Sequence, residues 1–350
     1  MFNYKDKNIF VGIDVHKKTY SLTVVMDQEV IKKTTLEARP IKLACYLNKH
    51  FSGANIFSAY EAGFSGFSLH RYLVENGIHN IVVHAASIEI AARERVKTDR
   101  RDSQKIAIQL ASGRLKSVHI PEIEREDKRL VSRYRETLAK EKSKKSNQIK
   151  SFLYRIGKMP YENESRITEK WINKMLSQEY STEQYFCLFE LCNQWKDLKE
   201  RIKNVEKKFA EQAEQELDLE TIYRSVPGIG PIAARVLANE LGDMKQFQNE
   251  GRLFSYTGLT PREYSSGEHR RLGHISRQGK PILRKILVQS AWRAISTDKN
   301  LGEIYHNMHP RVGAKRAIVG IARRLVGRIR SCINNKEHYK INQERVQMTA

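Results

Sequence analysis

The chain has 350 residues, with 62 Lys and Arg against 40 Asp and Glu, and its formal net charge is +22. This length supports roughly two or three domains with cores of their own, and 40% hydrophobic with 29% charged residues excludes wholesale disorder. Because the basic residues recur in all regions instead of forming one amphipathic helix, the charge favours nucleic acid as a partner over a membrane surface.

Residues 8–118 alternate strand-like and helix-like segments. Apolar runs predict strands over residues 9–15, 20–26, 30–35, 55–60 and 81–84. Helical spacing is present over residues 39–51, 87–95 and 102–115, and in the segment that contains Leu69 and Leu73. Three strands that can pair antiparallel, followed by strand–helix alternation, predict a mixed α/β domain over residues 1–120. The order of these elements resembles the ribonuclease-H-like fold.

Two long charged stretches follow, over residues 122–158 and 184–217, joined by a connector that contains Pro160. We expect an antiparallel helical hairpin or a dimerising coiled coil over residues 121–216. The basic block from Lys140 to Lys145 is either a solvated helix face or a row of phosphate contacts. In the second stretch, apolar residues that step by three or four predict a narrow packing seam of Phe189, Cys192, Trp195, Leu198, Ile202, Val205 and Phe209.

Residues 217–350 are predicted to form a third, mainly helical unit. A turn of Pro227, Gly228, Ile229 and Gly230 leads into a helix that begins near Pro231, which a first helical turn tolerates. Gly228 and Gly230 let backbone N–H groups approach an anion, and the helix N-terminus adds a positive dipole. The turn looks like a helix–hairpin–helix element, which holds nucleic-acid backbones without reading sequence. A plain packing joint is the alternative.

A segment rich in glycine, serine and arginine covers residues 256–285. Serine hydroxyls are weak nucleophiles unless a base, a metal or a cationic setting activates them. Arginines can fix a phosphodiester and stabilise the charge of its transition state. From the residues alone the segment is a basic nucleic-acid-binding loop, and a catalytic serine is the alternative. Its candidate nucleic-acid-binding residues are Arg262, Arg270, Arg271, Arg277, Lys280, Arg284 and Lys285.

Four carboxylates stand out in this basic chain. Asp14 and Glu61 each end an apolar strand-like run, and an unpartnered charge at Asp14 would be costly. Asp99 and Asp102 are three residues apart and share a helix face, although either one alone could simply cap the helix. Because Mg²⁺ and Mn²⁺ prefer carboxylate oxygens, the four acids predict metal-assisted phosphodiester chemistry on nucleic acid. The neighbouring candidate nucleic-acid-binding cations are Lys97, Arg100 and Arg101.

The cysteines show no CxxC pair, so we expect neither a zinc site nor a disulfide framework. The N-terminus lacks a signal-peptide pattern, and no apolar run reaches membrane-spanning length. We therefore expect a cytoplasmic protein with reduced cysteines and no membrane partner. The cysteines are Cys45, Cys187, Cys192 and Cys332.

These motifs together resemble the DEDD transposases of the insertion-sequence "one-ten" type, also called bridge-RNA-guided recombinases. Residues 12–17 resemble the family's opening motif, Glu61 its second acid, and residues 97–102 its third and fourth acids. One departure is Ser103, because an alanine often follows the fourth acid. The resemblance covers nearly the whole chain. The back half resembles the transposase domain over residues 226–230, 258–261, 266–267, 273–279 and 283–284.

The resemblance implies a RuvC-like front domain whose four acids bind Mg²⁺, and a serine nucleophile in the back domain. Ser266 matches because it directly precedes the motif glycine, with Ser265 and then Ser276 as fallbacks. The resemblance also implies a prokaryotic, DNA-associated enzyme that cuts and rejoins donor and target double-stranded DNA under the guidance of a structured RNA. Such enzymes act as homo-oligomers, here a dimer or a tetramer, with sites assembled from different subunits.

Two other functions fit some of these residues. A RuvC-like nuclease could use the same four acids to hydrolyse branched DNA with metal-activated water and no covalent intermediate. The dense arginines around Ser266 argue against it. The second is a nucleic-acid-binding protein without activity, such as a decayed transposase, although all four acids and the serine are present.

Overall fold

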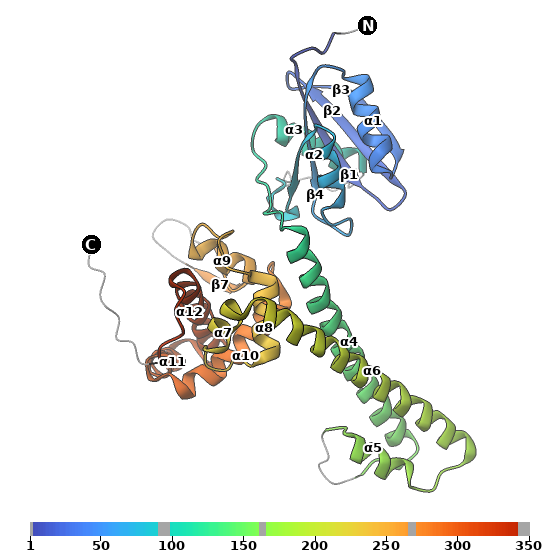
Figure 1. Ribbon diagram of the computed structural model, residues 1–350, viewed down its shortest axis with the longest axis vertical. Helices are drawn as coiled ribbons and strands as arrows, with labels where there is room; N and C mark the ends of the chain where they lie inside the picture. Colours follow the sequence, from blue (N-terminus) through green and yellow to red (C-terminus); the bar gives the residue numbers. More distant parts are fainter. Residues whose placement is uncertain (1–2, 90–98, 161–165, 265–270, 342–350) are drawn as a thin grey trace. The chain divides into compact units, whose positions relative to one another are not determined.

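The computed structural model describes residues 3–89, 99–160, 166–264 and 271–341, and of Asp99, Arg100 and Leu272 it describes the backbone. The chain divides into two compact units, Met1–Pro121 and Glu122–Ala350 (Figure 1). Each unit is held together by hydrophobic clusters of its own. The division of the second half into a helical region and a transposase domain stays a prediction.

The first unit contains a five-stranded sheet of order β3-β2-β1-β4-β5. Strands β1, β2 and β3 pair antiparallel in succession, whereas β4 pairs parallel with β1 and β5 parallel with β4. This confirms the predicted mixed α/β class. The elements are β1 (Asn8–Val15), β2 (Thr19–Met26), β3 (Glu29–Glu37), α1 (Pro40–His50), β4 (Asn55–Glu61), α2 (Ser68–Glu75), β5 (His79–Val83), η1 (Ala85–Ser87) and α3 (Asp99–Ala111).

One predicted helix of the first unit has different bounds in the structure. Helix α3 begins at Asp99, three residues before the predicted start at Asp102, so both acids belong to it. It ends at Ala111, before Gly113, whose φ of +66° is left-handed. The predicted helix over residues 87–95 lies mostly outside the described residues.

Alternation along β1 directs its side chains to two different layers. Ile9, Val11 and Ile13 are fully buried in the core that α1 and α2 complete with Leu47 and Leu73. The opposite face of β1 carries Phe10, Gly12 and Asp14, since these positions alternate with the core residues. Helix α3 lies against this second face.

Gly12 allows α3 to lie directly on the backbone of β1. A Cβ atom at Gly12 would be 2.0 Å from the carbonyl oxygen of Ser103 and 2.4 Å from the nitrogen of Ala107. Ser103 is fully buried and its hydroxyl shares a 2.9 Å hydrogen bond with the hydroxyl of Thr23 on β2. The serine that departs from the family pattern is therefore satisfied by a polar partner beneath it.

We expect Gly12→Ala to lower the free energy of unfolding by about 1–3 kcal/mol, because the added methyl group meets backbone atoms that cannot rotate away. Urea unfolding followed by circular dichroism measures the change. Gly63→Ala is the control, since a Cβ there meets only the carbonyl oxygen of Glu61, at 3.8 Å. Unchanged stability of Gly12→Ala would contradict the close contact between α3 and β1.

The second unit is mainly helical, as predicted. Its first part is a hairpin in which α4 (Ile123–Arg155) and α6 (Thr182–Gln215) lie side by side, with α5 (Glu169–Leu176) against them (Figure 1). The Ser181 side chain caps α6 by accepting a hydrogen bond from the backbone N–H of Gln184, and the backbone N–H of Ser181 donates to the side-chain oxygen of Gln184. The long helices begin and end where the charged stretches were predicted, within a few residues.

The predicted seam of α6 is correct except at its start. Cys192, Trp195, Ile202 and Phe209 are buried, but Phe189 is 39% exposed. Leu188 takes the buried position because α5 also packs there, and Leu188 joins a core with α5 residues. At the start of α6 the buried position is thus Leu188 instead of Phe189, one residue nearer to α5. Helical spacing alone cannot predict this shift.

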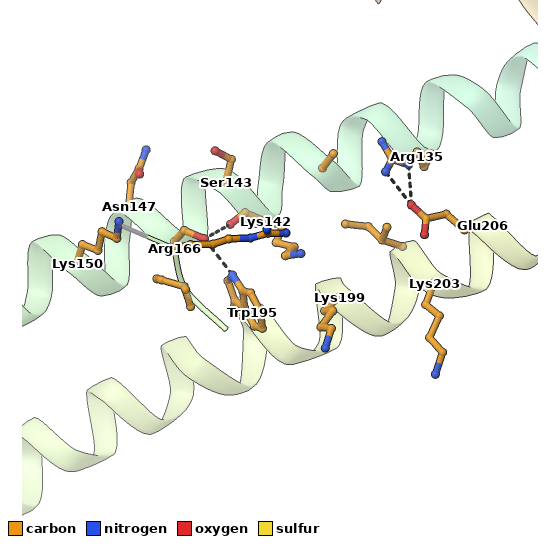
Figure 2. A pocket seen from close by; sticks show the side chains of 14 residues that line it. Arg135, Lys142, Ser143, Asn147, Lys150, Arg166, Trp195, Lys199, Lys203 and Glu206 are labelled. Carbon is orange, nitrogen blue, oxygen red and sulfur yellow. Dashed lines mark hydrogen bonds and ion pairs between the residues drawn. The ribbon is translucent and has the colours of Figure 1, made fainter. Parts of the chain in front are cut away.

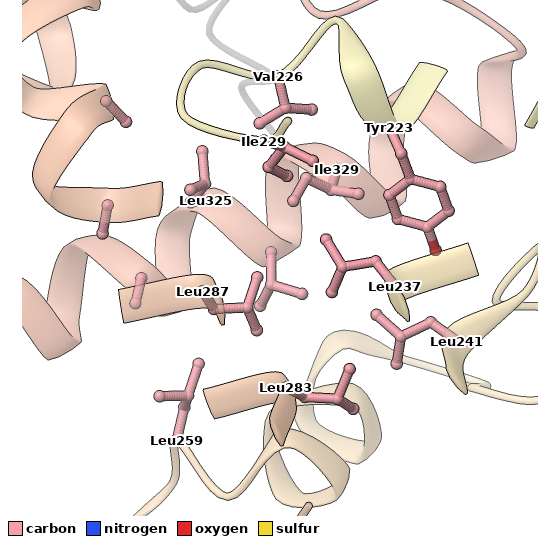
Figure 3. Close-up of a cluster of buried hydrophobic side chains, with 14 of the residues drawn as sticks. Tyr223, Val226, Ile229, Leu237, Leu241, Leu259, Leu283, Leu287, Leu325 and Ile329 are labelled. Atoms are coloured by element: carbon pink, nitrogen blue, oxygen red, sulfur yellow. The ribbon is translucent and has the colours of Figure 1, made fainter. Parts of the chain in front are cut away.

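The rest of the second unit is a bundle around one hydrophobic core, to which α8, α10 and α12 contribute leucines and isoleucines (Figure 3). Its elements are α7 (Leu217–Arg224), α8 (Pro231–Leu241), α9 (Glu250–Thr257), β6 (Pro261–Glu263), β7 (Leu272–Ile275), α10 (Pro281–Thr297), α11 (Lys299–Val312) and α12 (Ala314–Asn335). No helix of the described chain combines the length and the apolar character that a bilayer crossing requires.

Buried ion pairs attach the hairpin to this bundle. The fully buried carboxylate of Glu240 on α8 accepts two hydrogen bonds from Arg133 of α4, at 2.9 and 3.2 Å. Arg129 donates to the carbonyl oxygen of Glu240 at 2.8 Å. We call this contact between α4 and α8 the hairpin joint.

A second carboxylate in the same region, Glu216, accepts from Arg125 and Lys128 of α4 at 3.0 Å each, and from Arg235 of α8. Burial alone would raise the pKa of Glu216. The hydrogen bond from Lys128 and the charges of Arg125 and Arg235 outweigh burial and hold this pKa below its usual value. Glu216 therefore stays charged and holds the start of α4, the end of α6 and the middle of α8 together.

Glu240→Gln should lower the free energy of unfolding by roughly 3 kcal/mol, because it leaves arginine charges without their buried carboxylate. Chemical denaturation measures this loss. Glu200→Gln removes an exposed carboxylate that lies 3.6 Å from Lys203, and it should cost well under about 1 kcal/mol. Equal costs for the two variants would show that Glu240 contributes no more than a surface charge.

Candidate functional site

Two of the four predicted acids lie at the ends of neighbouring strands. The parallel register of β1 and β4 places Ile13 opposite Tyr60, so Asp14 and Glu61 follow one residue later on adjacent strands. The Asp14 side chain is 22% exposed and contacts Nε2 of His16 at 3.1 Å, while Glu61 is exposed. Carboxylates at this position in a sheet can share a bound cation.

The other two acids belong to the first turn of α3. Asp102 is 23% exposed and contacts Lys105 at 3.3 Å. The backbone of Asp99 opens the helix, and its side chain lies outside the described part of the chain. Arg101 is exposed beside Asp102, Arg100 is described by its backbone, and Lys97 lies outside the described residues.

Among the described side chains, no three His, Cys, Asp or Glu residues lie close enough together to hold a metal ion. The structure therefore brings Asp14 and Glu61 to one sheet edge but does not gather Asp102 with them. Since the Asp99 side chain lies outside the described part of the chain, the four-acid metal site stays a prediction. The donor chemistry of Asp14 and Glu61 fits a hard divalent cation.

The glycines of the turn before α8 have different surroundings. Gly228 has a φ of +79°, and a Cβ there would lie 2.7 Å from Cβ of Arg293 and 2.9 Å from the carbonyl oxygen of Ser290 on α10. Gly228 thus serves the packing of the turn. Gly230 is the N-cap of α8 and has open space around it. A 690 Å³ pocket at this turn, partly lined by Arg224 and Arg293, leaves room for an anion.

The predicted serine segment connects two short strands. Strands β6 and β7 pair antiparallel, and the Tyr264 nitrogen donates to the Arg271 carbonyl oxygen at 2.9 Å. Ser265, Ser266 and Arg270 fall between them, outside the described residues. The pairing of β6 with β7 therefore brings the two ends of the segment together. The candidate nucleophiles within it stay predictions.

The predicted cations near the β6–β7 strand pair differ in how far they are exposed to a ligand. Arg262, Arg271 and Arg277 are exposed, whereas Lys285 contacts Glu136 of α4 at 3.4 Å.

Two further cations of the segment are partly buried. Burial and the charge of Arg133 lower the pKa of Lys280, and burial and the charge of Arg277 lower the pKa of Arg284. The phosphate contacts predicted for Lys280 and Arg284 stay predictions.

One basic surface was not identified from the sequence. It is a 610 Å³ pocket between α4 and α6, and Lys142 from the basic block lines it (Figure 2). Its lining also includes Arg166, Trp195 and Lys199, which are distant from Lys142 in sequence. No single sequence motif could therefore predict that these residues lie together. The spacing of Lys199 and Lys203 on α6 was the available signal, because residues four apart share a helix face.

Comparison with known proteins finds two matching family models. The DEDD transposase model of IS110 elements matches residues 11–157, and the model described as "Transposase IS116/IS110/IS902 family" matches residues 220–306. The first match includes Asp14, Glu61, Asp99 and Asp102, and the second includes Ser266. The two matches occur in the order in which the motifs were found.

Curated relatives are similar over most of the chain. The transposase for insertion sequence element IS1533 of Leptospira borgpetersenii is 27% identical, over 82% of this chain and 85% of that protein. The transposase for IS1111A of Coxiella burnetii is 23% identical, over 94% and 91%. A putative transposase, y4qE, of Sinorhizobium fredii is 28% identical, over 82% and 72%.

Proposed function

Since the chain belongs to the IS110 family of DEDD transposases, and so is an enzyme that acts on DNA, we propose that it cuts and rejoins the donor and target DNA of an insertion sequence. The observation that carries this proposal is the placement of Asp14 and Glu61 at adjacent parallel strand ends. Four acids and a serine would share the chemistry, and a structured guide RNA would select the DNA.

We assign the first unit to the ribonuclease-H-like, RuvC-like fold. The support is its strand order, in which three antiparallel strands are followed by two that run parallel to β1. Asp14, Glu61, Asp99 and Asp102 would hold Mg²⁺ or Mn²⁺ in this unit. A bound divalent cation would supply charge stabilisation at the scissile phosphate.

Ser266 is the proposed nucleophile. Its Oγ attacks the phosphorus and loses its proton to solvent, the bond from phosphorus to the 3′ oxygen breaks, and that oxygen leaves as a 3′-hydroxyl after protonation. The product is a 5′-phosphoserine link that conserves the phosphodiester bond for rejoining. Exposed Arg262, Arg271 and Arg277 would hold the phosphate oxygens.

We infer the partners from the family resemblance of the motifs. Donor and target DNA, a structured guide RNA and further copies of this chain, as a dimer or tetramer, complete the proposed assembly. The net charge of +22 suits such polyanions. A RuvC-like nuclease that hydrolyses branched DNA is the second candidate, because the same acids would serve it.

Asp14→Asn should reduce DNA cleavage at least about 100-fold, because the amide loses the charge that attracts the cation. Addition of EDTA to the wild type should have a similar effect. Cleavage of labelled DNA with and without Mg²⁺ measures both. Asp27→Asn is the control, since Asp27 is an exposed turn residue of the same unit. Full activity of Asp14→Asn would make the acids structural.

Ser266→Ala should abolish covalent protein–DNA adducts on suicide DNA substrates while RNA and DNA binding persist. Denaturing gels detect the adducts, and Ser265→Ala and Ser276→Ala are compared in parallel. Adducts from Ser266→Ala but not from Ser265→Ala would move the nucleophile to Ser265. Metal-dependent cleavage by the wild type without any adduct would favour the nuclease.

A further inference from the structure

The pocket between α4 and α6 is strongly basic. Arg135, Lys142 and Lys150 line it from α4, Lys199 and Lys203 from α6, and Arg166 from the segment before α5. Among the described residues that line it, the carboxylate is Glu206. None of these residues belongs to the acids or the serine of the proposed chemistry.

Glu206 does not neutralise the pocket. Its Oε1 accepts hydrogen bonds from Nε and Nη2 of Arg135, at 3.1 and 2.7 Å, so its charge is committed to one partner (Figure 2). Lys199 also contacts Glu169 of α5 at 2.7 Å, but both side chains of that pair are about half exposed and weakly coupled. The described lining therefore keeps an excess of positive charge.

Lys142 and Arg166 lie between the two helices (Figure 2). The Lys142 Nζ lies 4.8 Å from the centroid of the buried Trp195 ring, whose Nε1 donates to Ser146 Oγ at 2.9 Å. Burial, and then the charges of Lys199 and Arg166, lower the pKa of Lys142. The contact with Trp195 thus holds Lys142 near Lys199 and Arg166, although the three positive charges repel each other.

We propose that this pocket binds the phosphodiester backbone of an unpaired nucleic-acid strand. A phosphate oxygen accepts from both the planar guanidinium of Arg166 and the ammonium of Lys142, and its charge relieves their repulsion. A recess between two helices admits a flexible strand, whereas the phosphates of a duplex are fixed on a convex surface. The volume of 610 Å³ is within the range of pockets that enclose a ligand.

The test compares Lys142→Gln/Arg166→Gln with the wild-type full-length protein. Fluorescence anisotropy measures binding of labelled oligonucleotides of roughly 12 nucleotides, as single-stranded RNA, single-stranded DNA and duplex DNA. We expect both single strands to bind at least about tenfold more weakly, with a salt slope lower by about 1.4 if each cation contacts one phosphate. The RNA or DNA strand that loses more affinity identifies the natural ligand. Duplex binding should change much less.

The matched control is Lys207→Gln/Arg155→Gln, which removes one lysine from an exposed position of α6 and one arginine from an exposed position of α4, both outside the pocket. An equal loss in this control, or an equal loss on duplex DNA, would overturn the proposal. Thermal melting of each variant verifies its fold. Binding is measured without cleavage, so failure here would leave the adduct assay of Ser266 unaffected.

Discussion

The front unit depends on the contact between two backbones at Gly12. A helix normally packs on a sheet through a layer of side chains, but here α3 touches β1 because the strand presents no side chain. Ser103, one residue after Asp102, is fully buried in this contact and its hydroxyl bonds to Thr23. This contact thus fixes the distance between α3 and the sheet. It involves the residue that follows Asp102 on the helix and the residue two positions before Asp14 on the strand.

The second unit deals with its surplus of positive charge in two different ways. At the hairpin joint and around Glu216, arginines and lysines are paired with buried carboxylates, and these contacts hold helices together. In the pocket between α4 and α6 the cations outnumber the described carboxylate that lines it. The same residue types therefore stabilise the fold in one place and leave a surface for polyanions in the other.

Patterns of short range predicted the fold well. The strands of the first unit follow from short apolar runs, and the long helices from apolar residues spaced by three or four. Phe189 was predicted wrongly because its exposure depends on α5, a segment distant in sequence. The functional sites were harder to predict than the fold. Asp14 and Glu61 are neighbours only because β1 and β4 are adjacent in the sheet, and the pocket forms only because Arg166 packs against α4 and α6. Asp14, Glu61 and Asp102, whose side chains are described, do not form one three-carboxylate cluster, and the spacing of acids along the chain could not predict this.

The hairpin joint has a mechanical consequence. Helix α4 has 33 residues, which corresponds to a rod about 50 Å long at 1.5 Å per residue. Because Glu240 and Glu216 clamp its base to α8, the rod cannot pivot freely there and must turn with the bundle. A tilt of about 5° at the base of such a rod displaces its far end by about 4 Å. Any rotation of the bundle would therefore be carried along α4 and would displace the far end of the hairpin more than its base.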